Sequence, residues 1–112
     1  MPARRMELME DLKILAKDTR NVYGAEAKYK VAQIYFDGGQ TDKAEQEVLN
    51  YIEVSTPHTY WLARSFVLLA DVYMKSGRNL DAKQYLLSLK QNYQADDDIA
   101  GMIESRLEKL KS

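Results

Sequence analysis

His58 is the only histidine in the chain and the first residue to consider for catalysis. An imidazole can act as a general base, but it needs a nucleophile within reach. The sequence contains no cysteine, and Ser55 and Thr59 lie too near His58 in sequence to indicate a catalytic triad by themselves. The many carboxylates lack the apolar flanking residues that would raise a pKa. We therefore predict no catalytic residue and expect a protein that is not an enzyme.

Asp96, Asp97 and Asp98 form an acidic run that invites a calcium-binding interpretation. A calcium loop spaces its acidic residues alternately, has a central glycine and closes with a glutamate, and this run has none of these features. Acidic residues in the first turn of a helix interact favourably with its dipole, which accounts for the run. The pair Gly38-Gly39 lacks the lysine and the spacing of a phosphate-binding loop. No metal and no cofactor are predicted.

The composition indicates a single soluble domain over residues 1–112, with 46% apolar and 29% charged residues. The formal net charge is -1, and the only adjacent basic pair is Arg4-Arg5, so nucleic acid is disfavoured as a partner. Without cysteine, disulfides and thiolate zinc sites are excluded. No stretch approaches the roughly 18 apolar residues of a membrane span, and residues 1–10 lack the apolar core of a signal peptide. Cytoplasm and periplasm both remain open.

The elements that would position a site come from an internal repeat. A set of small residues and tyrosines recurs 38 residues further along the chain: Ala32, Tyr35, Gly39 and Ala44 are followed by Ala70, Tyr73, Gly77 and Ala82. We predict two repeat units, residues 21–56 and 57–95, each made of two helices joined by a tight turn. No segment alternates apolar and polar residues with period two, so strands are not expected.

Turn and capping residues set the expected helix ends. A helix over about 22–37 ends at Gly38-Gly39, and Asp42 followed by Glu45 predicts a capping-box start for the next helix. In the second unit, Thr56 is the predicted N-cap and Pro57 the first helical residue.

The second unit turns at Gly77, after which Asn79 is predicted to cap a helix that runs to about Tyr93.

The first helix of the first unit carries two apolar stripes, where a surface helix needs only one. One stripe consists of Ala27, Val31, Ile34 and Tyr35, and the other of Ala25, Tyr29, Ala32 and Phe36. Two stripes predict a helix sandwiched between neighbours, as in a stacked helical array. Tyr35 and Tyr73 are interpreted as packing residues between paired helices, and Trp61 as a plug between the two units.

The two ends of the chain differ from its middle. Residues 1–20 resemble the second helix of a preceding unit, with an apolar side made of Met6, Met9, Leu12, Leu15 and Ala16. Residues 96–112 carry one narrow apolar stripe, made of Ile99, Met102, Ile103, Leu107 and Leu110. One apolar side means one neighbour, so we predict a C-terminal capping helix and about six helices in total.

These residues resemble the tetratricopeptide repeat family, whose signature has a small residue, a tyrosine three positions on and an alanine nine positions after that. Ala32, Tyr35 and Ala44 match it in the first unit, as do Ala70, Tyr73 and Ala82 in the second. Lys28 and Phe66 stand where the family has an early tryptophan, and the repeat is four residues longer than the usual 34. The resemblance implies a right-handed α-solenoid of antiparallel helix pairs. The chain looks like the C-terminal segment of a longer bacterial protein of this family.

The family's geometry implies that the inner face of each first helix lines a concave groove. Transferred by position, the groove residues are Glu26, Tyr29, Gln33, Phe36 and Asp37, then Arg64, Val67, Asp71, Met74 and Lys75. Aromatic and methionine side chains beside charges suit a bound peptide or helix, although the apolar members could equally pack against a neighbouring helix. One subclass clamps a C-terminal carboxylate with lysine and asparagine. Here Asp71 would repel that carboxylate, so such a partner is not expected.

Two functions follow as hypotheses. The first is a non-catalytic scaffold or adaptor that binds a protein or peptide partner in the groove. The second is self-association through the unpaired N-terminal helix, which predicts a homo-oligomer that is lost when Leu12 or Leu15 is replaced by a charged residue.

Overall fold

The computed structural model describes residues 3–54 and 56–111, and the side chains from Leu8 onward apart from Ser55. These residues form six helices and no strand: α1 (Ala3–Leu15), α2 (Val22–Asp37), α3 (Thr41–Glu53), α4 (Thr59–Lys75), α5 (Asn79–Asn92) and α6 (Ile99–Lys109). The all-helical prediction and the number of helices are confirmed. The predicted roles of Met6, Arg4-Arg5 and Ser55 lie outside the described residues and side chains.

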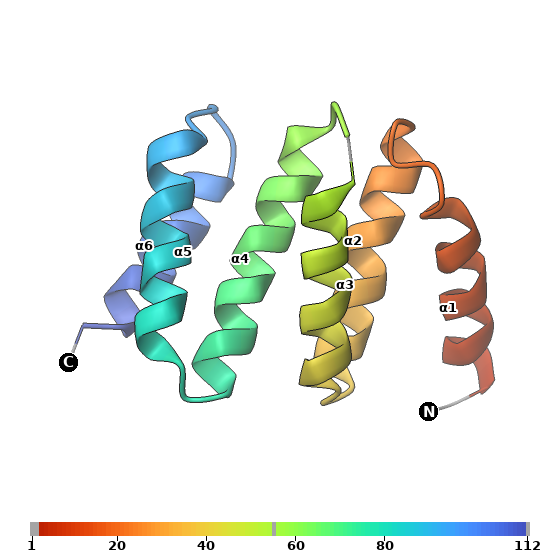
Figure 1. The fold of residues 1–112 in the computed structure, drawn as a ribbon, viewed down its shortest axis with the longest axis horizontal. Coiled ribbons are helices and arrows are strands. Elements are labelled where there is room, and N and C mark those ends of the chain that lie inside the picture. Colours follow the sequence, from red (N-terminus) through yellow and green to blue (C-terminus); the bar gives the residue numbers. More distant parts are fainter. Residues whose placement is uncertain (1–2, 55, 112) are drawn as a thin grey trace.

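The helices follow one another along a body of 41 × 30 × 22 Å, with the two chain ends at opposite ends of the long axis (Figure 1). Each helix contacts the next one in the chain, and α2 also contacts α4, as α4 contacts α6. Within the described residues, α1, α3 and α5 do not approach one another closely. The even-numbered helices therefore form one connected layer, whereas the odd-numbered helices stand apart from each other.

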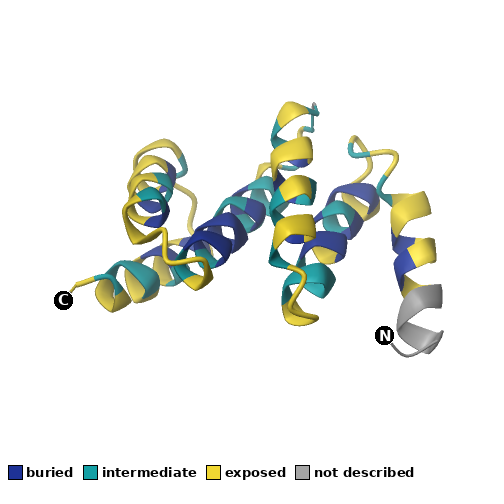
Figure 2. Cartoon of the chain, turned by 60° about the horizontal axis from the view of Figure 1, so that its bottom comes forward, coloured by how far each residue is buried: buried dark blue, intermediate teal, exposed yellow. Residues whose placement is uncertain are grey.

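The two apolar stripes of α2 pack into two separate clusters, as their spacing predicts. Ala25, Tyr29 and Ala32 belong to the main cluster, which is built mostly by α4, α5 and α6. Ala27 and Val31 belong to a second cluster with Met9 and Leu12 of α1. Figure 2 shows the result, with buried residues concentrated along α2 and α4 and one exposed side on the outer helices. Helix α2 is the element that joins the two clusters.

Close helix contacts and tight turns are where the sequence places them. Ala32, Ala44, Ala70 and Ala82 are all at most 1% exposed, so helices approach at each of them. The two turns use glycine at a backbone angle that other residues rarely adopt, with φ of 80° at Gly39 and 78° at Gly77. The predicted stops after α2 and α4 are therefore confirmed.

The predicted helix starts are less accurate. Helix α3 starts at Thr41 after Gln40, which makes no side-chain cap, so the capping box of Asp42 and Glu45 is wrong. Helix α5 starts at Asn79 itself, so this residue is not the cap.

Helix α4 begins at Thr59, two residues after the predicted start at Pro57. Thr56 does not cap it. Its hydroxyl oxygen instead accepts a hydrogen bond from the His58 backbone N–H and donates to the carbonyl oxygen of Thr19, 2.7 Å away. A tertiary contact with the preceding loop has displaced the local capping signal.

Helix α6 covers one end of the main cluster with the predicted stripe. Ile99 and Ile103 are fully buried, and the other three members pack against the cluster at partial exposure. At the opposite end, Met9 and Leu12 of α1 are buried against α2, while Leu15 is 51% exposed. The predicted apolar side of α1 is therefore divided between a packed part and an open part.

Candidate functional site

The ten residues predicted for the groove lie on α2 and α4, which contact each other. Half of them line one small hollow of about 100 Å³: Tyr29, Gln33, Arg64, Val67 and Asp71. Leu68, Met102 and Arg106 complete its wall. The hollow thus draws on α2, α4 and α6, which are the three helices of the connected layer.

A chain of hydrogen bonds runs along the exposed edge of α2. The Tyr29 hydroxyl donates to Gln33 Oε1 at 2.7 Å, and Gln33 Nε2 donates to Asp37 Oδ1 at 2.8 Å. Both steps have the four-residue spacing that places side chains above one another on a helix. The chain fixes the orientation of the Gln33 amide, with its oxygen toward Tyr29 and its nitrogen toward Asp37.

Arg64 connects α4 to α2 across this edge. Its guanidinium donates to the hydroxyl oxygens of Tyr29 at 3.1 Å and Tyr60 at 3.0 Å. It also lies over the Tyr29 ring, 4.9 Å from the centroid, and near the Trp61 ring at 5.9 Å. Burial raises the pKa of Tyr60, a shift that the hydrogen bond from Arg64 opposes. Tyr60 therefore stays protonated and donates to Asp98 at 2.8 Å.

Asp71 is neutralised by Arg106, a residue that the sequence did not single out. Arg106 Nε and Nη2 donate to the two carboxylate oxygens of Asp71 at 2.7 and 3.0 Å, a two-pronged pair. The Arg106 guanidinium therefore offsets the negative charge through which Asp71 was expected to repel a carboxylate. Only the spatial contact of α6 with α4 reveals this partner, because no sequence motif links two residues so far apart.

The remaining predicted residues differ in how they are exposed. Val67 is 3% exposed and lines the hollow, while Phe36 and Met74 are half-buried and pack against the main cluster. The Lys75 ammonium lies 5.4 Å from the centroid of the Phe36 ring, another link from α4 to α2.

Glu26 forms an ion pair of 2.7 Å with Lys30 on its own helix and is not among the residues that line the hollow. Asp37 is exposed at the C-terminal end of α2.

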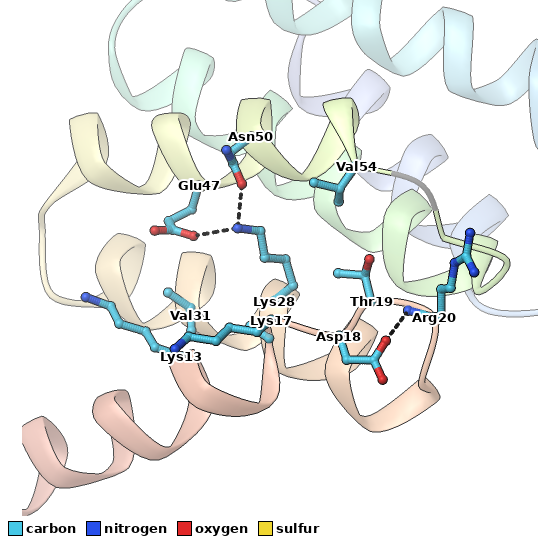
Figure 3. A pocket seen from close by; sticks show the side chains of 11 residues that line it. Lys13, Lys17, Asp18, Thr19, Arg20, Lys28, Val31, Glu47, Asn50 and Val54 are labelled. Carbon is cyan, nitrogen blue, oxygen red and sulfur yellow. Dashed lines mark hydrogen bonds and ion pairs between the residues drawn. The ribbon is translucent and has the colours of Figure 1, made fainter.

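A second and larger concavity was not anticipated from the sequence. This cleft of about 480 Å³ is lined by the end of α1, the loop that follows it, α2 and α3 (Figure 3). Its lining residues are Lys13, Ala16, Lys17, Asp18, Thr19, Arg20, Lys28, Val31, Glu47, Asn50 and Val54. No catalytic or metal motif marks these positions in the sequence, and only the spread of α1 away from α3 creates the cleft.

The residues first considered for chemistry have structural roles. His58 Nε2 lies 2.8 Å from the carbonyl oxygen of Arg20 and ties the two loops together. Asp97 accepts from the backbone N–H of Ile99 and from the Tyr93 hydroxyl, and the acidic run precedes α6 rather than lying in its first turn. Trp61 is half-buried and stacks at 5.6 Å from Tyr29, so it contacts the main cluster and the neighbouring unit together.

Within residues 3–54 and 56–111, no group of three or more metal-ligating side chains is close enough to hold an ion. None of the helices described there combines the length and apolar character needed to cross a bilayer. Comparison of the chain with protein-family models, curated proteins and solved structures finds no match.

Proposed function

We propose that the chain is a non-catalytic interaction segment that binds a peptide or helix of a partner protein on the joint face of α2 and α4. The single observation that carries this proposal is the small hollow that places the polar side chains of Tyr29, Gln33, Arg64 and Asp71 beside the apolar side chains of Val67, Leu68 and Met102. Such a combination of a few fixed polar groups with apolar margins suits a peptide side chain.

We also propose that the helices form a right-handed α-solenoid of antiparallel helix pairs in the manner of tetratricopeptide repeats. Contacts between α2, α4 and α6, together with the separation of α1, α3 and α5, support a curved stack with one tight layer. In a stack that curves toward its closely packed layer, that layer faces the concave side. The face of α2 and α4 is then the inner one.

Rigid side chains support binding on this face. Tyr29, Gln33 and Arg64 are held by hydrogen bonds to one another or to neighbours, so a ligand would not have to order them. Phe36 and Met74 are half-buried and lie three residues beyond Gln33 on α2 and three beyond Asp71 on α4, where an apolar residue of a partner can cover them. The hydrogen-bonded polar residues would orient the ligand, and Phe36 and Met74 would pack against its apolar side chain.

A pull-down from the source lysate with matched surface variants tests the proposal. The test variant is Phe36→Ser/Met74→Ser, and the control is Leu49→Ser/Leu87→Ser, two exposed leucines on α3 and α5. We expect the native chain and the control variant to capture a partner that the test variant does not capture. Circular dichroism should show that all three proteins are folded. Equal capture by both variants would place the binding surface elsewhere.

A second candidate function, self-association through α1, is favoured by one observation. Among the helices that the structure describes, α1 contacts α2 alone, and Leu8, Ile14 and Leu15 are 51%, 63% and 51% exposed. Leu12 is buried against α2, so charging it would damage the fold and would not report on association.

The informative variant for self-association is Leu8→Glu/Leu15→Glu, with Leu80→Glu on α5, 71% exposed, as the control. Sedimentation velocity over a range of concentrations should show a dimer that only the α1 variant loses. A native chain that stays monomeric at high concentration rules this function out.

A further inference from the structure

The cleft between α1 and α3 carries a net positive charge, unlike the rest of the chain. Four basic residues line it, Lys13, Lys17, Arg20 and Lys28, against two acidic ones, Asp18 and Glu47. The whole chain carries a net charge of -1. The cleft is thus a local positive field on a slightly acidic protein, and a concave wall concentrates such a field.

Much of this positive charge is not used internally. Lys28 Nζ donates to Glu47 Oε2 at 3.4 Å and to Asn50 Oδ1 at 2.7 Å. Within the described part of the chain, Lys13, Lys17 and Arg20 form no ion pair. The Lys13 ammonium lies 5.6 Å from the centroid of the Tyr35 ring. Three cations are therefore available to a ligand without breaking an existing salt bridge.

The wall that carries Lys17 and Arg20 is held in place by three contacts. The carbonyl oxygens of Thr19 and Arg20 are bound by the side chains of Thr56 and His58 at 2.7 and 2.8 Å. Gly24 of α2 lies so close below the loop that a Cβ atom there would overlap the Asp18 carbonyl oxygen. The loop is therefore anchored to two other parts of the fold, so the cleft is preformed.

Three of the four cations are spread apart in the view of Figure 3. Lys13 and Arg20 stand at opposite ends of the view in Figure 3, with Lys28 between them. A compact anion such as one phosphate group reaches only one of these ends. An elongated ligand with several negative charges reaches all of them, which selects for a polymer or an extended peptide.

We propose that this cleft binds an extended acidic segment of a partner protein. Glu47 and Asp18 interrupt the cations, which suits separated carboxylates and disfavours the continuous charge of a nucleic acid backbone. Val31, Val54 and Ala16 supply an apolar floor for the aliphatic parts of a peptide. The site is separate from the face of α2 and α4 proposed above, so either can fail without the other.

Fluorescence anisotropy with a short labelled peptide of alternating glutamate and leucine tests the site. The test variant is Lys17→Glu/Arg20→Glu. The control is Lys83→Glu/Lys109→Glu, which makes the same change in net charge at exposed lysines of α5 and α6. We expect saturable binding at low salt, a loss of about tenfold or more in the test variant and less than about twofold in the control. A peptide with glutamine in place of glutamate should not bind.

Equal losses in the two variants would mean that only net charge matters and would overturn the site. Tighter binding of a single-stranded oligonucleotide than of the peptide, lost in the same variant, would overturn the peptide as the occupant. The α2–α4 variant Phe36→Ser/Met74→Ser should bind the peptide like the native chain, which separates this site from the one proposed above. All four residues of the test and control variants are exposed, so each variant is expected to fold.

Discussion

Two grooves occupy equivalent positions in the two sequence units and have opposite chemistry. In the first, Lys28 of α2 meets Glu47 of α3 at 3.4 Å. In the second, 38 residues further on, Phe66 of α4 meets Tyr85 of α5 with ring centroids 6.3 Å apart. The first lies in the polar cleft of about 480 Å³, and the second borders an apolar hollow of about 150 Å³.

The difference shows that the paired helices do not need the same groove residues in both units. In both units, close approach occurs at alanines, Ala32 and Ala44 in the first and Ala70 and Ala82 in the second, all of them buried. Positions 28 and 66 stand where the resembled family has its early tryptophan, and one carries a charge while the other carries a ring. Because the close approach of the helices is set by the alanines, these two positions can differ in chemistry.

The largest expected effect concerns the wall of the first groove. Gly24→Ala should cost about 3 kcal/mol of unfolding free energy, because the new methyl group overlaps the Asp18 carbonyl oxygen and must push the loop away. The equivalent position in the second unit, Leu62, carries a full side chain packed on the main cluster. Urea denaturation followed by circular dichroism measures the cost.

Gly101→Ala on α6 is the matched control, because nothing lies within 4 Å of a Cβ atom built there. It should stabilise the protein by about 0.5–1 kcal/mol through helix propensity alone. Similar effects of the two substitutions would show that Gly24 is not in close contact with the loop.

The second expected effect separates the two grooves directly. Phe66→Ala should cost about 2–3 kcal/mol, because the ring packs against the main cluster while remaining partly exposed. Lys28→Ala should cost about 1 kcal/mol or less, because a partly exposed ion pair contributes little. Thermal and urea unfolding of both variants under the same conditions provide the comparison. A larger loss of unfolding free energy in Lys28→Ala than in Phe66→Ala would show that the first groove contributes more to stability than the second.

The sequence predicted the periodic features well, because they depend on local spacing. The two stripes of α2 separated correctly into two clusters, with Ala27 and Val31 on one side and Ala25 and Ala32 on the other. The glycine turns were also correct, since a positive φ at Gly39 and Gly77 has a strong local preference.

Features that depend on distant parts of the chain were missed. Arg106 reaches Asp71 only because α6 packs on α4. The start of α4 was misplaced because Thr56 bonds to the loop after α1 and not to its own helix. The cleft itself depends on how far α1 stands from α3, a quantity that periodicity does not fix.

The third expected effect tests the packing of the repeated tyrosine in the second unit. Burial, and then the neighbouring Glu45, raises the pKa of Tyr73 to about 12 from an ordinary value of 10.0. As the pH rises, Tyr73 ionises in the unfolded chain before it ionises in the folded one. The stability that protonated Tyr73 contributes is therefore fully present below pH 10 and is lost as the pH rises toward 12. Between pH 8 and pH 11, the unfolding free energy of the native chain should fall by about 1 kcal/mol more than that of the Tyr73→Phe variant. Urea titrations at both pH values measure this difference, and equal losses would show that Tyr73 titrates normally.

The smallest expected effect is also the most direct test of whether the grooves are interchangeable. The double substitution Lys28→Phe/Glu47→Tyr copies the aromatic pair of the second unit into the first. Because the alanine contacts are untouched, we expect the unfolding free energy to change by no more than about 0.5 kcal/mol. The dependence of stability on salt should fall, since one charge pair has been removed.

The same double substitution should also weaken the binding of the acidic peptide in the anisotropy assay, because Lys28 lies between Lys13 and Arg20 in the view of Figure 3. The effect should be smaller than that of Lys17→Glu/Arg20→Glu, since net charge is unchanged and no new repulsion is introduced. A protein that unfolds after this exchange would show that Lys28 and Glu47 hold α2 against α3. The two grooves would then differ in structural role as well as in surface chemistry.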